Sequence, residues 1–94
     1  MRHARPGDLD RLDDLLDRLR AVDGLTERRN GVFYRGSKAF LHFHQDRAGL
    51  FADLKVGDGW LRYPVSSASA RRTLVADARR VLRGETTALR GQRS

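Results

Sequence analysis

The sequence predicts an α+β fold, a two-layer sandwich in which a four-stranded antiparallel meander carries an N-terminal and a C-terminal helix on one face. Apolar residues recur at helical spacing near both ends of the chain. Between them lie short alternating segments separated by glycine-containing turns. The length of 94 residues fits one domain, residues 1–94, with an ordered core at about 8–84 and a flexible tail at 85–94.

The first helix is predicted from its cap and its apolar stripe. Asp8 follows Pro6-Gly7 and is placed to accept hydrogen bonds from the first turn as an N-cap. Gly24 supplies a C-terminal stop, and the polar residues 25–30 are expected to be a connector. The stripe consists of Leu9, Leu12, Leu15, Leu16, Leu19 and Val22.

The meander is predicted from its turns. Gly36-Ser37 and Asp58-Gly59 are two-residue hairpin turns. The first turn sets Tyr34 opposite Ala39 and Val32 opposite Leu41, and the second sets Val56 opposite Leu61 and Leu54 opposite Tyr63. Both turns assign the same alternation of faces. The predicted strands are 32–35, 38–44, 50–56 and 60–65, and the predicted core face carries Val32, Tyr34, Ala39, Leu41, Phe43, Leu50, Ala52, Leu54, Val56, Leu61, Tyr63 and Val65.

The second helix is predicted to begin at a Ser66-Ser67 cap and to end at Gly84. Its polar side is crowded with arginines, among them Arg72 and Arg79, and the chain has a formal net charge of +7. Such a balance favours an anionic partner such as nucleic acid. Abundant arginine and scarce lysine are also typical of a GC-rich coding sequence, so the charge has two interpretations.

The face of the sheet opposite the core is the most informative predicted surface, because it mixes aromatic, histidine and cationic side chains. By alternation it carries Phe33, Arg35, Lys38, Phe40, His42, His44, Phe51, Asp53, Lys55, Trp60 and Arg62. Three hypotheses follow.

The first hypothesis is a homodimer or binding module that uses this face. The second is a nucleic-acid interface, in which aromatic rings stack on bases while cations meet phosphates. Its candidate residues are Phe33, Lys38, Phe40, His42, His44, Lys55, Trp60, Arg62, Arg72 and Arg79. The third is a metal or small-ligand site at His42 and His44, which point the same way on a strand, with Asp53 as a third ligand.

An enzyme is not favoured. No glycine-rich phosphate loop is present, and no serine has an evident His–Asp pair to activate it. The chain has no cysteine, which excludes disulfides and thiolate metal sites and fits a reducing cytoplasm. We expect a cytoplasmic protein with no cofactor and no membrane partner, because no apolar run has the length of a membrane span.

Two family resemblances add to these expectations. The segment 24–43, from Gly-Leu-Thr-Glu to Phe-Leu-His-Phe, resembles the opening of YjbR-like proteins, which implies a compact α+β fold and DNA binding. His42-Phe43-His44, Ala52-Asp53-Leu54 and Gly59-Trp60-Leu61-Arg62-Tyr63 are similar to segments of small bacterial luciferase-domain proteins. Neither resemblance implies a catalytic residue.

Overall fold

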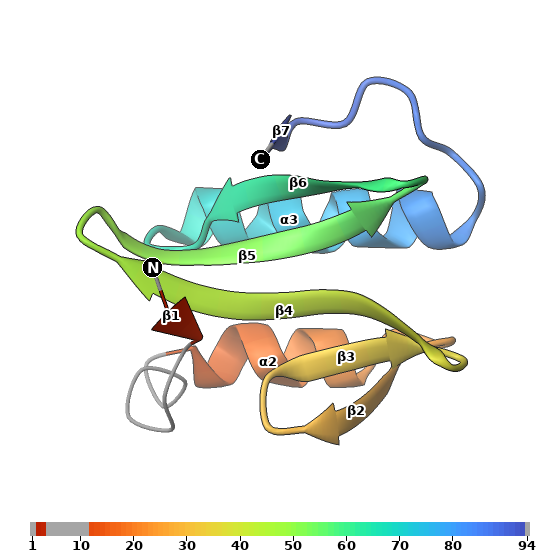
Figure 1. The fold of residues 1–94 in the computed structure, drawn as a ribbon, viewed down its shortest axis with the longest axis horizontal. Helices are drawn as coiled ribbons and strands as arrows, with labels where there is room; N and C mark the ends of the chain where they lie inside the picture. The colour runs from red at the N-terminus through yellow and green to blue at the C-terminus, as the bar shows by residue number, and fades with distance from the viewer. Residues whose placement is uncertain (1, 4–11, 94) are drawn as a thin grey trace.

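The computed structural model describes residues 2–3 and 12–93 (Figure 1). The predicted cap Asp8 and the apolar residue Leu9 lie outside this part of the chain. The elements, in chain order, are β1 (Arg2–His3), α2 (Asp13–Arg20), β2 (Thr26–Arg29), β3 (Val32–Arg35), β4 (Lys38–Asp46), β5 (Gly49–Val56), β6 (Gly59–Pro64), α3 (Ala68–Leu82) and β7 (Gln92–Arg93).

The fold is α+β with an antiparallel sheet and two helices, but the sheet is larger than the predicted meander. Six strands follow one another in the order β2-β3-β4-β5-β6-β7, and β1 pairs with β4 off this path. The prediction of four strands between two terminal helices was therefore wrong, since β1 precedes α2 and β7 follows α3. The extra strands are short or highly charged, so alternation does not reveal them.

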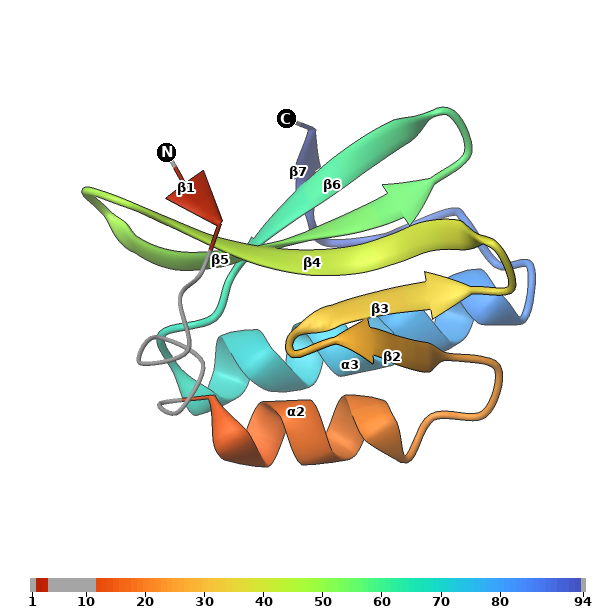
Figure 2. The ribbon, with the colours of Figure 1, turned by 60° about the horizontal axis from the view of Figure 1, so that its bottom comes forward.

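Figure 2 shows α2 and α3 side by side beneath the sheet, with β6 and β7 rising away from them. We call the side of the sheet away from the helices the open face. The hydrophobic core lies between the helices and the sheet, and it is built from Leu12, Leu15, Leu16, Leu19, Phe33, Phe40, Leu41, Phe43, Leu50, Ala52, Leu54, Tyr63, Val65, Leu74, Val75, Ala78 and Val81.

The hairpin of β3 and β4 contains a β-bulge that changes which residues face the core. Tyr34 pairs with Ala39 as the turn predicts, but the register then shifts, so that Phe33 pairs with Leu41. Phe40 is the extra residue of the bulge, and it is 3% exposed, while Phe33 is fully buried. Both belong to the core, so their predicted place on the open face was wrong. A bulge adds one residue to one strand and thereby reverses the alternation beyond it.

The hairpin of β5 and β6 turns one residue earlier than predicted. Val56 pairs with Gly59 across Gly57 and Asp58, and Leu54 pairs with Leu61. Gly57 has φ +59°, a conformation that favours glycine. The predicted pairs were therefore offset by two residues, and an even offset leaves every side chain on its predicted face.

The first helix ends earlier than predicted, at Arg20, and the expected connector includes the edge strand β2. Glu27 of this strand accepts hydrogen bonds from the Arg20 guanidinium at 2.7 Å and from the Gly31 amide at 2.9 Å. These bonds, that from Arg20 above all, lower the pKa of Glu27. The ion pair of Arg20 and Glu27 links the end of α2 to the hairpin of β2 and β3.

The second helix follows the prediction at both ends. The Ser67 side chain accepts a hydrogen bond from the Ala70 amide, and Gly84 follows the helix with φ +85°. Neither α2 nor α3, the two helices in the described ranges, has the length and apolar character needed to cross a membrane.

Residues 85–93, expected to be part of a tail, follow the C-terminal end of α3. Leu89 packs against the core, and β7 pairs with β6. Asp77 of α3 accepts hydrogen bonds from the Tyr63 hydroxyl at 2.8 Å and from the Arg90 amide at 2.7 Å. This buried carboxylate, 1% exposed, joins α3, β6 and the C-terminal segment. Burial, followed by the bond to Asp77, raises the pKa of Tyr63.

Candidate metal centre

Two neighbouring strands bring three potential metal ligands together on the open face. His42 and His44 lie two residues apart on β4, and their side chains therefore project from the same face. Asp53 of β5 pairs directly with His42, and Phe51 pairs with His44. The long hairpin of β4 and β5 sets this register, so the backbone itself positions the cluster.

The three side chains converge closely enough to share an ion. One candidate ligand atom of each of His42, His44 and Asp53 lies within 4.8 Å of the other two. Nδ1 of His44 lies 3.3 Å from Oδ2 of Asp53. The other carboxylate oxygen, Oδ1, lies 3.5 Å from Nε of Arg62, which is the partner of Asp53 on β6. Arg62 therefore holds one oxygen of the carboxylate while the second faces the imidazole.

The cluster is shielded although it lies on the open face. His44 is 3% and Asp53 8% exposed, whereas His42 is partly exposed. The ring of Phe51 stacks on His44 with centroids 6.0 Å apart, and the ring of Trp60 meets His42 edge-on at 4.9 Å. Aromatic walls around polar ligand atoms exclude water and strengthen electrostatic interactions with a bound ion.

Cationic side chains border the cluster. Nζ of Lys55 lies 5.1 Å from the centroid of the Trp60 ring, and the Arg62 guanidinium lies 5.9 Å from that of Phe51. These positive charges oppose a bound cation, but they favour an anionic molecule that completes its coordination. The arrangement can therefore bind a metal ion and, beside it, a negatively charged ligand.

The predicted nucleic-acid residues do not form one surface. Lys55, Trp60 and Arg62 lie on the open face with the cluster, whereas Arg72 and Arg79 are exposed on α3, on the opposite side of the sheet (Figure 2). Phe33 and Phe40 are core residues and are not available to stack on bases. Lys38 is exposed at the start of β4.

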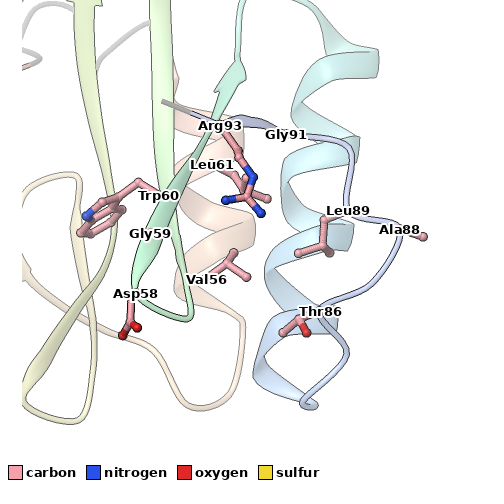
Figure 3. A pocket seen from close by; sticks show the side chains of 10 residues that line it. All are labelled: Val56, Asp58, Gly59, Trp60, Leu61, Thr86, Ala88, Leu89, Gly91 and Arg93. Atoms are coloured by element: carbon pink, nitrogen blue, oxygen red, sulfur yellow. The ribbon is translucent and has the colours of Figure 1, made fainter.

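Two hollows lie near the β5–β6 hairpin. The first has a volume of about 500 Å³ and is lined by residues of the β5–β6 hairpin and of the C-terminal segment. Figure 3 shows Arg93 directed into it beside Leu61, while Trp60 points to the other side of β6. The second, of about 730 Å³, joins Trp60 to the end of the β3–β4 hairpin, and we call it the end groove.

Sequence reasoning identified the three candidate ligands but not the end groove. It also missed Asp77 as the buried anchor that accepts hydrogen bonds from Tyr63 and Arg90. The signal for the anchor is an acid within the apolar stripe of the second helix, between Leu74 and Ala78. The end groove includes Val81 and Asp58. These residues come from elements far apart in sequence, so no local pattern indicates the groove.

Comparisons with models of known protein families, with curated proteins and with solved structures found no match to this chain.

Proposed function

We propose that this protein is a non-enzymatic binding module that holds a divalent transition-metal ion on the open face of its sheet. His42, His44 and Asp53 are the ligands. The observation that carries the proposal is their convergence within 4.8 Å. Two imidazoles and one carboxylate also bind zinc and iron in mononuclear sites that keep a position open for another ligand.

The donor atoms favour zinc and its neighbours over the hard cations. Imidazole nitrogen suits zinc, nickel, copper and iron, whereas calcium and magnesium prefer oxygen ligands throughout. The cluster offers nitrogen from His42 and His44 and oxygen from Asp53. Zn²⁺ is therefore the appropriate probe, and Ca²⁺ is its negative control.

His44 and Asp53 already have the spacing of two ligands of one zinc ion. Two ligands of a tetrahedral zinc ion with bonds of about 2.1 Å lie about 3.4 Å apart. The distance from His44 Nδ1 to Asp53 Oδ2 is 3.3 Å. The third ligand must approach more closely than the overall 4.8 Å, and this ligand is His42, the partly exposed member of the cluster.

Arg62 is a positioning residue in this proposal. It lies 3.5 Å from one oxygen of Asp53 and thereby orients the other toward His44. Outer-shell partners of this kind fix ligand geometry in metal sites. The guanidinium also opposes the charge of the ion, so we expect affinity in the micromolar rather than the nanomolar range.

Zinc binding can be measured directly and through Trp60. Isothermal titration should give one Zn²⁺ per chain and no heat with Ca²⁺. Trp60 is the single tryptophan and its ring lies 4.9 Å from that of His42. Paramagnetic Ni²⁺ should therefore quench its fluorescence, and Zn²⁺ should displace the nickel and restore it. A protein that takes up neither ion contradicts the proposal.

Matched variants test the ligand set. The double variant His42→Ala/His44→Ala should abolish uptake, and Asp53→Asn should weaken it about tenfold or more. Asp58→Asn makes the same chemical change at an exposed turn residue and should leave binding unchanged. Retention of full affinity by the double-histidine variant would place the metal elsewhere and contradict the assignment.

Partial exposure of Phe51 and Trp60 favours a second candidate, a homodimer formed through the same face. Its test is the mass in solution, expected near twice 10.7 kDa, with and without Zn²⁺. Trp60→Arg should return a dimer to a monomer. A monomeric mass at high concentration in both conditions would contradict this candidate.

Nucleic-acid binding stays a prediction, and the strongest support for it outside the open face is the basic surface of α3. Arg72 and Arg79 are exposed there, but of the aromatic residues expected to stack on bases Phe33 and Phe40 are buried in the core and Trp60 lies on the open face. Titration with an oligonucleotide at two salt concentrations, followed by amide NMR, tests it. Shifts confined to α3 that vanish on adding salt would indicate nonspecific attraction.

A further inference from the structure

The end groove lies where three chain segments meet. The β3–β4 and β5–β6 hairpins turn at the same end of the sheet, and the C-terminal end of α3 reaches that end as well (Figure 1). The groove between them has a volume of about 730 Å³, within the range of small-molecule sites. Its location differs from that of the histidine cluster, although Trp60 borders both.

The floor of the end groove is apolar. Ala39, Phe40 and Trp60 contribute from the sheet, and Val81 contributes from α3. Phe40 and Val81 belong to the hydrophobic core, so the groove reaches down to the core surface. An apolar floor of this kind favours a ligand with a flat hydrocarbon body, which displaces water there.

The rim of the end groove is positively charged. Arg35, Lys38 and Lys55 line it, and Asp58 is the one acidic residue of its lining. Arg35 also donates to the backbone carbonyl of Leu82 at 3.4 Å, which satisfies one carbonyl at the C-terminal end of α3. Lys38 is exposed, and Lys55 lies above the ring of Trp60. The excess of cations over carboxylate selects for negative charge.

We propose that the end groove binds a small organic anion with a flat apolar body, such as an aromatic carboxylate. The ring of the ligand lies on the floor beside Phe40 and Trp60, and its anionic group meets Lys38 and Lys55 at the rim. The proposal stands on the lining of the groove and does not depend on a metal ion at the histidine cluster.

Two other hollows in the described part of the chain lack this combination. The hollow of Figure 3 is lined by one basic residue, Arg93, together with Asp58. The hollow on α3, of about 300 Å³, contains Arg72, Arg80 and Arg90, but among the described residues its aliphatic lining is limited to Ala76 and no aromatic ring borders it. An aromatic anion therefore finds both an apolar floor and a basic rim only in the end groove among the three.

The probe is 1-naphthoate, with 1-naphthalenemethanol as a neutral analogue of similar shape. Amide NMR titrations in the presence of EDTA keep the metal site out of the measurement. We expect naphthoate to shift the amides of Lys38, Phe40, Trp60 and Val81. The neutral analogue should bind at least fivefold more weakly, and inorganic phosphate, which has no apolar body, should not compete at equal concentration.

Charge-matched variants complete the test. Lys38→Gln should weaken naphthoate binding about fivefold. Arg72→Gln removes the same charge from the exposed surface of α3 and should leave the affinity unchanged. Both residues are exposed, so both variants are expected to fold, and circular dichroism checks this. The proposal is overturned by absent binding, by equal affinity for the neutral analogue, or by equal losses in the two variants.

Discussion

The two buried carboxylates in the described part of the chain, Asp53 and Asp77, have different surroundings. Asp77 makes short hydrogen bonds, 2.8 Å and 2.7 Å, to groups on two other segments, and it lies on the helix side of the sheet. Asp53 makes longer contacts, 3.3 Å and 3.5 Å, to side chains of adjacent strands on the open face. A carboxylate that joins distant segments contributes to folding, whereas one held loosely beside two imidazoles is suited to binding.

The largest expected effect is that of Asp77→Ala. It leaves the Tyr63 hydroxyl and the Arg90 amide without their acceptor, and each unsatisfied buried group costs about 1–3 kcal/mol. We expect the free energy of unfolding to fall by about 3 kcal/mol, measured by urea denaturation. A loss below about 0.5 kcal/mol would remove the distinction between the two carboxylates.

Gly91→Ala should have the next largest effect on the free energy of unfolding, because it disturbs the packing of the C-terminal segment against Tyr63, the partner of Asp77. A Cβ at this position would lie 2.8 Å from Cβ of Leu61 and still closer to the ring of Tyr63. Crowding of this kind costs about 1–3 kcal/mol, or the C-terminal segment detaches from β6. Hydrogen exchange of the β6 and β7 amides distinguishes these results. Unchanged exchange together with unchanged stability would contradict the close packing.

Tyr63→Phe should lower the free energy of unfolding by about 1 kcal/mol at neutral pH. It should also change how stability depends on pH in the alkaline range. The pKa of Tyr63 is raised in the folded state, so its stabilising contribution is complete below about pH 10, the unfolded value, and is lost as pH rises. The wild-type protein should therefore lose more stability than the variant above about pH 10. If the free energies of unfolding of the two proteins, measured by urea denaturation, changed in parallel with pH across this range, the role given to the Tyr63 hydroxyl would be contradicted.

Of these four variants, Asp53→Asn should have the smallest effect on stability and the largest on metal uptake. Its contacts are long, and the amide that replaces the carboxylate keeps its size and one acceptor oxygen, so we expect the free energy of unfolding to change by about 1 kcal/mol or less. Zinc affinity should fall in the same samples. If the variant were as unstable as Asp77→Ala, the open-face cluster would be a structural anchor and the comparison would fail.

Local patterns predicted most elements correctly. The cap at Ser67, the stop at Gly84 and the strand Val32–Arg35 appear as expected, because each depends on residues close in sequence. The prediction that His42 and His44 share a face rests on the same alternation. Short or charged strands such as β2 and β7 gave no such signal, since their pairing depends on a neighbouring strand rather than on their own residues.

The sequence alone determined the spacing of apolar residues that marks each helix or strand, and it determined the residue types of the candidate site. These follow from backbone geometry and side-chain chemistry. Only the tertiary structure decided the bulge at Phe40, which moved two phenylalanines into the core, and the register that sets Asp53 opposite His42. Both depend on how strands fit against one another and against the helices. Packing of that kind is a property of the whole chain, because each contact joins residues that no local pattern relates.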